Sequence, residues 1–126
     1  MDEKKFLKLN DITAYKRSFH LSNYIWDVVI GWNNFSRNTV GEQFASAADS
    51  ISANIAEGFG RYFKKDKIKF YYYSAASVKE CFDWNEKSKV RKLLGKKEYE
   101  HIFKEISELP KEINQLIHYT NTKLNK

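Results

Sequence analysis

The stretch "SISANIAEGFGRYFKKDKIKFYYY", residues 50–73, marks the place where one helix of this chain ends and the next begins. Before the turn, apolar residues recur at gaps of four, three and four, which is the spacing of one helix face. These residues are Phe44, Ala48, Ile51 and Ile55. Gly58 or Gly60 suits the C-terminal end of a helix, because glycine has a permissive backbone. We therefore expect a helix at 40–59, opened by a capping box of Thr39 and Glu42.

The same periodicity predicts three further helices, at 12–35, 65–94 and 97–124. The last of these carries one unbroken apolar series, formed by Tyr99, Ile102, Ile106, Leu109, Ile113, Leu116, Thr120 and Leu124. Pro110 lies inside that series, and we expect it to kink the helix without ending it. The helix at 65–94 has a stripe of Ile68, Tyr71, Ala75, Val78 and Phe82, and Gly95 is expected to end it.

The helix at 12–35 differs from the others because it carries two apolar series on different sides. One contains Tyr15, Phe19 and Trp26, and the other contains Leu21, Ile25, Val28, Trp32 and Phe35. A helix in a monomeric bundle buries only one such face, so the second predicts contact with another copy. Four long helices with short connections predict an all-α, antiparallel up-down-up-down four-helix bundle, one domain over residues 1–126.

Composition narrows the class of protein. Hydrophobic residues make up 42% of the 126 residues and aromatic residues 16%, which is typical of a folded chain. The single Cys81 cannot form an internal disulfide, and the charged N-terminal sequence does not resemble a secretory signal. The most apolar stretch, at 24–32, is short and contains Asp27, so we expect no membrane span. A cytoplasmic location is the default expectation.

Positive charge is concentrated in the second half of the chain. The net charge is +6, and residues 1–62 are neutral, with seven basic and seven acidic residues. The first basic cluster, at the predicted turn near residue 61, consists of Arg61, Lys64, Lys65, Lys67 and Lys69. The second basic cluster, before the last helix, consists of Lys87, Lys89, Arg91, Lys92, Lys96 and Lys97. Such asymmetry favours an anionic partner, although a solvated surface would look the same.

Catalytic motifs are weak in this chain. The pair Glu98 and His101 has the Glu-x-x-His spacing of di-metal bundles, but no second pair accompanies it, so no metal is expected. Cys81 lies among aromatic residues, where a buried structural thiol is the simpler interpretation. "GFGRYF" lacks the lysine and hydroxyl residue of a phosphate-binding loop. We expect no cofactor and no enzymatic activity.

Ser50, Asn54 and Glu57 form a polar stripe on the helix at 40–59. Glu57 lies in the last turn, where the helix dipole disfavours an anion, and Arg61 is close enough to compensate. We interpret Asn54 and Glu57 as a clamp on the following turn, with contact to a ligand as the alternative.

The stretch at 41–80 resembles a bacterial four-helix-bundle family, first noticed as proteins encoded by intervening sequences within 23S ribosomal RNA genes. The residues that carry the resemblance include Gln43, Ser50, Asn54, Glu57, Gly58, Arg61, Ser77 and Glu80. A fainter similarity extends from about Ile12 to Ile117. The fold is also similar to the accessory variability protein of diversity-generating retroelements.

The resemblance implies a ring-shaped homopentamer with a basic surface, which retroelement relatives use to engage a reverse transcriptase and nucleic acid. Where the family usually has basic residues after the glutamine, this chain has Ala45 and Ser46, so a binding surface would consist of the two clusters. Two hypotheses follow. The chain binds nucleic acid without sequence specificity, RNA in preference to DNA, and an accessory role beside a nucleic-acid enzyme is one form of this function. Alternatively, it is a scaffold for other proteins and makes no contact with nucleic acid.

Overall fold

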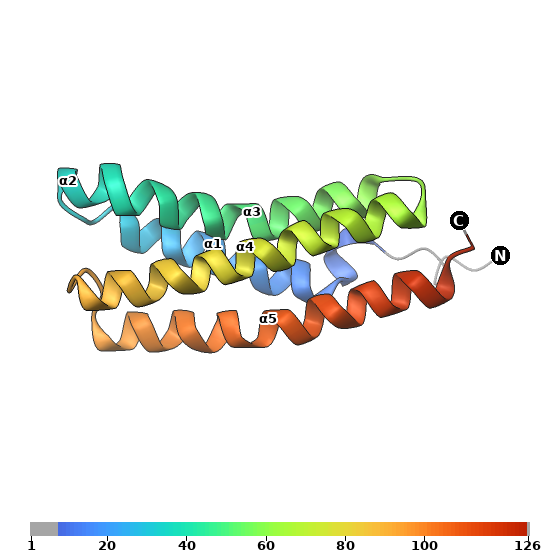
Figure 1. Ribbon diagram of the computed structural model, residues 1–126. Helices are drawn as coiled ribbons and strands as arrows, with labels where there is room; N and C mark the ends of the chain where they lie inside the picture. The colour runs from blue at the N-terminus through green and yellow to red at the C-terminus, as the bar shows by residue number, and fades with distance from the viewer. Residues whose placement is uncertain (1–7, 126) are drawn as a thin grey trace.

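The computed structural model describes residues 8–125, which form four long helical segments and no strand (Figure 1). The predicted all-α fold is thereby confirmed. In chain order the elements are η2 (Leu9–Asp11), α1 (Thr13–Val29), α2 (Asn34–Ser36), η3 (Arg37–Gly41), α3 (Glu42–Gly60), α4 (Lys64–Val90) and α5 (Lys96–Lys123). Because α2, η3 and α3 follow one another without a gap, they make up a single long segment. Figure 1 shows the segments side by side, with successive turns at alternate ends.

The core lies along the centre of the bundle, where each long segment contributes one buried stripe. The stripe predicted for α4 is only partly correct, because Phe82 is exposed and half of the buried residues are polar. The buried residues of α4 are Tyr71, Ser74, Val78, Cys81, Asn85 and Ser88. On α3 the predicted series of Phe44, Ala48, Ile51 and Ile55 is fully buried. On α5 the predicted series is buried from Ile102 to Thr120, and Glu112 is buried beside it. The helix continues through Pro110, as expected, and its two halves are out of line in Figure 1. Periodicity therefore identified the inward faces of α3 and α5 correctly.

The predicted boundary between the first two helices is wrong. The helix predicted at 12–35 ends at Val29, and the next segment begins at Asn34 instead of residue 40. Asn33 is the residue that caps it, because its side-chain oxygen accepts a hydrogen bond from the Ser36 amide at 2.9 Å. The expected capping box does not form, since the Thr39 hydroxyl donates to the Phe35 carbonyl inside the helix.

Helix ends near the other turns also differ from expectation. The helix predicted at 65–94 ends at Val90, five residues before Gly95. Lys92 terminates α4 because its backbone is left-handed, with a φ of 61°. The Leu93 amide then donates a hydrogen bond back to the Ser88 carbonyl at 2.8 Å. Gly95 instead precedes α5, and its amide donates to the Glu98 carboxylate at 2.9 Å.

Gly58 is required for close packing and not for an unusual backbone angle. No described glycine has a positive φ. A Cβ atom on Gly58 would lie 2.7 Å from the ring of buried Tyr71 and 2.9 Å from the Lys67 carbonyl oxygen. The missing side chain therefore lets α3 and α4 approach one another at their shared turn. One turn further along, the buried Ser74 hydroxyl donates to the Ile51 carbonyl at 2.8 Å and joins the same two helices.

An ion pair joins α1 to α5 on the opposite side of the bundle. The Arg17 guanidinium donates to both oxygens of Glu112, at 2.9 and 3.0 Å, and to Glu105 at 2.6 Å. The hydrogen bonds that Arg17 donates to Glu112 and Glu105 raise its pKa, so the guanidinium stays charged. Among the described residues, no helix is long and apolar enough to cross a membrane.

Candidate nucleic-acid interface

The first basic cluster surrounds the turn between α3 and α4, and three of its five side chains stabilise that end of the bundle. Lys67 Nζ donates to the Phe59 carbonyl at 2.6 Å, so it caps the C-terminus of α3. Lys64 Nζ donates to the carbonyls of Asn121 and Leu124, at 3.2 and 3.1 Å, and so caps α5. Burial lowers the pKa of Lys67.

Arg61 is the third of these residues. Its guanidinium pairs with Glu57 at 2.9 Å and lies 4.5 Å from the centre of the Phe70 ring. The sequence-based pairing of Glu57 with Arg61 is therefore confirmed. Asn54 does not take part in a clamp, because its Nδ2 donates to the Ser50 carbonyl of its own helix at 2.9 Å. Instead of Asn54, the close packing at Gly58 and the Lys67 cap stabilise this turn.

Two cations of the first cluster remain exposed to solvent. Lys65 has no ion-pair partner among residues 8–125, and Lys69 lies 5.8 Å from the centre of the Phe70 ring. The turn also exposes three aromatic rings. Tyr62 is 69% exposed, Phe63 54% and Tyr73 48%.

The second basic cluster surrounds the turn between α4 and α5, and here most of the cations are free. Lys87 pairs with Asp83 at 2.7 Å and lies over the Trp84 ring, while Lys89 lies over the Tyr99 ring. Four further cations are exposed and have no ion-pair partner among residues 8–125. These are Arg91, Lys92, Lys96 and Lys97.

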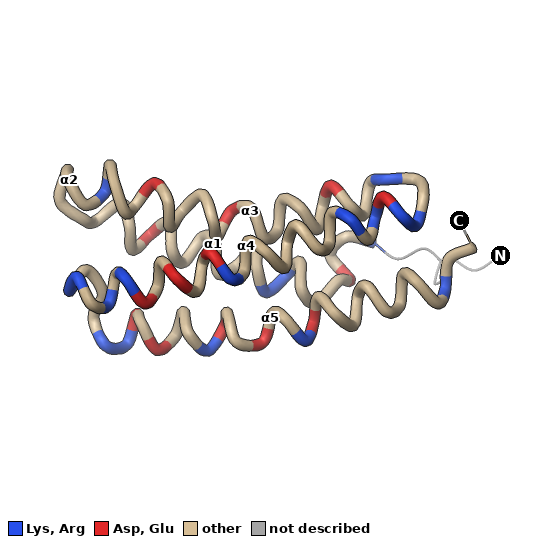
Figure 2. Tube along the Cα trace, in the orientation of Figure 1, with Lys and Arg blue, Asp and Glu red and all other residues tan. Residues whose placement is uncertain are grey.

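The two clusters lie at opposite ends of α4 (Figure 2). A helix of 27 residues is about 40 Å long, so one small ligand cannot contact both clusters of a single chain. Between them, acidic and basic residues are mixed along the bundle. The two predicted basic clusters therefore form two charged ends of the bundle, and they do not join into one continuous stripe.

The remaining residues of the sequence motif lie on or near the surface of α3 and α4. Gln43 and Glu80 are exposed, and Ser50 and Ser77 are half-buried. On α3, residues 43, 50, 54 and 57 follow at gaps of seven, four and three, so they share one stripe. Glu57 on this stripe pairs with Arg61, which contacts Phe70 of α4, so this end of the stripe lies at the α3–α4 seam.

The residues considered for metal binding or nucleophilic chemistry have structural surroundings. Glu98 accepts the Gly95 amide, and the His101 ring lies 4.4 Å from that of Tyr24, measured between ring centres. No group of three or more potential ligands gathers within residues 8–125. Cys81 is fully buried, and this burial raises the pKa of its thiol to about 12. The thiolate is therefore strongly disfavoured at neutral pH.

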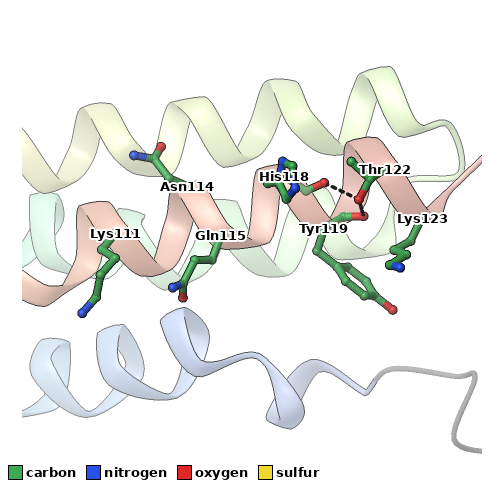
Figure 3. A pocket seen from close by; sticks show the side chains of 7 residues that line it. All are labelled: Lys111, Asn114, Gln115, His118, Tyr119, Thr122 and Lys123. Atoms are coloured by element: carbon green, nitrogen blue, oxygen red, sulfur yellow. Dashed lines mark hydrogen bonds between the residues drawn. The ribbon is translucent and has the colours of Figure 1, made fainter.

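A surface hollow of about 900 Å³ lies beside the C-terminal half of α5 (Figure 3). Within residues 8–125, its lining residues all come from this one helix. Lys111 and Tyr119 point to one side of α5 and Asn114 to the other, so polar groups do not converge on a common point. Thr122 donates to the His118 carbonyl within the helix. The hollow is an open flank and not a small-molecule pocket.

Comparison with protein families identifies the class of protein to which this bundle belongs. A family model described as 23S rRNA-intervening sequence protein matches residues 10–115, from η2 to the middle of α5. The chain belongs to this family. The match includes both basic clusters and the α3–α4 seam. No individual curated protein matches the chain.

Proposed function

We propose that this chain is a non-enzymatic, self-associating protein that binds nucleic acid through phosphate contacts at its charged ends. The observation that carries the proposal is the group of four free cations, Arg91, Lys92, Lys96 and Lys97, at the α4–α5 turn. Exposed like charges repel one another, and no described carboxylate pairs with any of the four. A polyanion would supply the missing counter-charges.

The backbone of the α4–α5 turn adds support. Lys92 adopts a left-handed conformation, with a φ of 61°, at a position where helices usually place glycine or asparagine. A non-glycine residue in this region has an energetic cost of about 1 kcal/mol. A cation retained there at that cost is consistent with a role for its charge.

We propose RNA as the preferred partner over DNA. The family description refers to sequences within 23S rRNA, which is an RNA setting. The similarity to retroelement accessory proteins suggests that the chain acts beside a nucleic-acid enzyme such as a reverse transcriptase. Phosphate contacts do not read bases, so binding is expected to be independent of sequence.

Self-association is supported by an apolar shelf between α1 and α3. Phe19 and Trp26 on α1, and Ile30 just after its end, are all at least 45% exposed. Trp26 borders a hollow of about 400 Å³ whose other lining residues are small or polar and belong to α3, including Ala45 and Ala53. Large side chains beside a trough of small ones form a surface that a second copy can fill. The family resemblance implies five copies in a ring.

Association would multiply the charged ends. Each added copy contributes another four free cations, and linked weak contacts raise the overall affinity without any new type of contact. The same shelf favours the second candidate function, a scaffold that binds a different protein. The two functions differ in their dependence on the free cations.

The experiment is a binding titration of labelled single-stranded RNA at low salt with two matched variants. The first replaces Arg91, Lys92, Lys96 and Lys97 by Gln. The second replaces four exposed lysines on the flanks, Lys16, Lys79, Lys104 and Lys111, by Gln, which gives the same net charge. We expect the first variant to lose at least about tenfold in affinity and the second to lose much less. Equal losses, or no binding by the unaltered protein, would reject the proposal.

A further inference from the structure

The turn between α3 and α4 exposes aromatic rings beside cations. The rings of Tyr62 and Phe63 pack edge to face, with centroids 4.9 Å apart and planes at 87°. Phe70 and Tyr73 form a second edge-to-face pair, with centroids 5.3 Å apart. The Arg61 guanidinium lies over Phe70 and so connects the turn to this second pair. Lys65 and Lys69 are exposed nearby in the sequence.

Exposed aromatic side chains are ordinary when they occur singly, but here Tyr62, Phe63, Tyr72 and Tyr73 are all exposed within twelve residues. The bundle core does not need these rings, since the neighbouring Tyr71 is the one that packs inside. The cluster therefore offers a set of π faces to a partner.

The α4–α5 turn provides an internal comparison. Both ends of α4 carry cations, but the rings at the second cluster, Trp84 and Tyr99, are half-buried and lie beneath Lys87 and Lys89. The second basic cluster therefore offers cations to a partner without the exposed rings of the first. At the first cluster, cations and exposed rings occur together, and this is the combination that binds single-stranded nucleic acid, because bases stack on rings while the backbone follows the charges.

We propose that the α3–α4 turn is a stacking platform for unpaired bases of a nucleic-acid strand. Tyr62 and Phe63 supply the ring surfaces, and Lys65 and Lys69 contact the flanking phosphates. Bases within a duplex are already stacked and cannot reach these rings. The platform makes the protein select single-stranded over double-stranded nucleic acid. This inference rests on the proposed nucleic-acid function and specifies the form of the ligand.

The test compares three labelled oligonucleotides of equal length by fluorescence anisotropy: an intact single strand, an abasic single strand and a duplex. The abasic strand keeps the phosphates and removes the bases. Stacking is worth about 1–3 kcal/mol per base, so we expect the intact strand to bind at least about fivefold more tightly than the abasic strand. We also expect the duplex to bind more weakly than the intact strand.

The variant Tyr62→Ala/Phe63→Ala should bind the intact strand only as well as the unaltered protein binds the abasic strand. Its affinity for the abasic strand should not change. Tyr62→Leu/Phe63→Leu keeps the apolar bulk and should lose the same selectivity, which separates stacking from a folding defect. Tyr119→Ala/Phe103→Ala removes two other exposed rings from α5 and should leave the selectivity intact.

Equal binding of intact and abasic strands by the unaltered protein would overturn the stacking platform and leave the proposed function in place. Absence of binding to all three oligonucleotides at low salt would overturn both. A changed molecular mass of the Tyr62→Ala/Phe63→Ala variant in light scattering would also overturn the platform, because the rings would then serve contacts between copies.

Discussion

Gly58 and Tyr71 determine how closely α3 and α4 approach at the charged turn. The Tyr71 ring is fully buried beside Gly58, and burial raises the pKa of its hydroxyl to about 12. A Cβ atom at position 58 would lie too close to both this ring and the Lys67 carbonyl oxygen. Sequence reasoning selected Gly58 for its backbone freedom, but the physical requirement is the space that a Cβ atom would occupy.

Gly58→Ala is expected to lower the free energy of unfolding by about 1–3 kcal/mol, because the added methyl group overpacks the helix contact. Gly60→Ala is the matched control, since nothing lies within 4 Å of its added Cβ. That substitution should be neutral or stabilising by up to about 1 kcal/mol, as alanine favours a helix over glycine. Urea denaturation of both variants measures the difference. Equal effects would show that close packing at Gly58 is not limiting.

At the scale of the helices, the repeat of apolar residues predicted which faces of α3 and α5 are buried, but it did not predict where the helices end. The stripes of α3 and α5 were predictable because each buried side chain follows the helical period. The turn at 30–33 was not predicted, because Trp32 continues the apolar period of α1 although it lies beyond the end of that helix. In the structure the Trp32 ring packs against Phe44, with ring centres 6.5 Å apart. Helix ends depend on single residues such as Asn33 and Lys92, which the spacing of apolar residues does not identify.

Sequence reasoning also located both basic clusters, because lysines and arginines stand close together in the chain. It did not separate the cations that cap helices from the free ones. Lys67 contacts the Phe59 carbonyl, eight residues earlier, and Lys64 reaches Leu124, sixty residues later. These partners are set by how α3 and α5 pack against α4, which no local pattern encodes.

Lys67 is therefore expected to stabilise the fold, and Lys65 is expected to contribute to the binding of nucleic acid. Lys67→Met removes a charge-assisted bond to the end of α3 and should lower the free energy of unfolding by about 1–2 kcal/mol. Lys65→Met alters an exposed residue and should change stability by less than about 0.5 kcal/mol while weakening the binding of single-stranded RNA. Thermal unfolding and the anisotropy titration report the two effects separately. An unchanged melting temperature for Lys67→Met would argue against the cap.

On the scale of the whole molecule, we propose that the shelf on α1 and α3 is the surface through which copies of the chain associate. The side chain of Trp26 is 54% exposed in a single chain. Light scattering behind a sizing column should give a mass several times the 14.9 kDa of one chain, and five times for the implied pentamer. Trp26→Lys should reduce that mass, whereas Tyr119→Lys, at an exposed position on α5, should not. A mass of one chain for the unaltered protein would refute self-association.

The measurement that tests the central claim most directly is the salt dependence of RNA binding. If the free cations of the α4–α5 turn hold phosphates, log affinity falls linearly with log salt concentration. Replacing Arg91, Lys92, Lys96 and Lys97 by Gln should then make the slope shallower by about 0.7 for each phosphate of a single strand that the variant no longer neutralises. The flank variant of equal net charge should keep the original slope. An affinity that does not respond to salt, or a slope that is the same in all three proteins, would contradict the account.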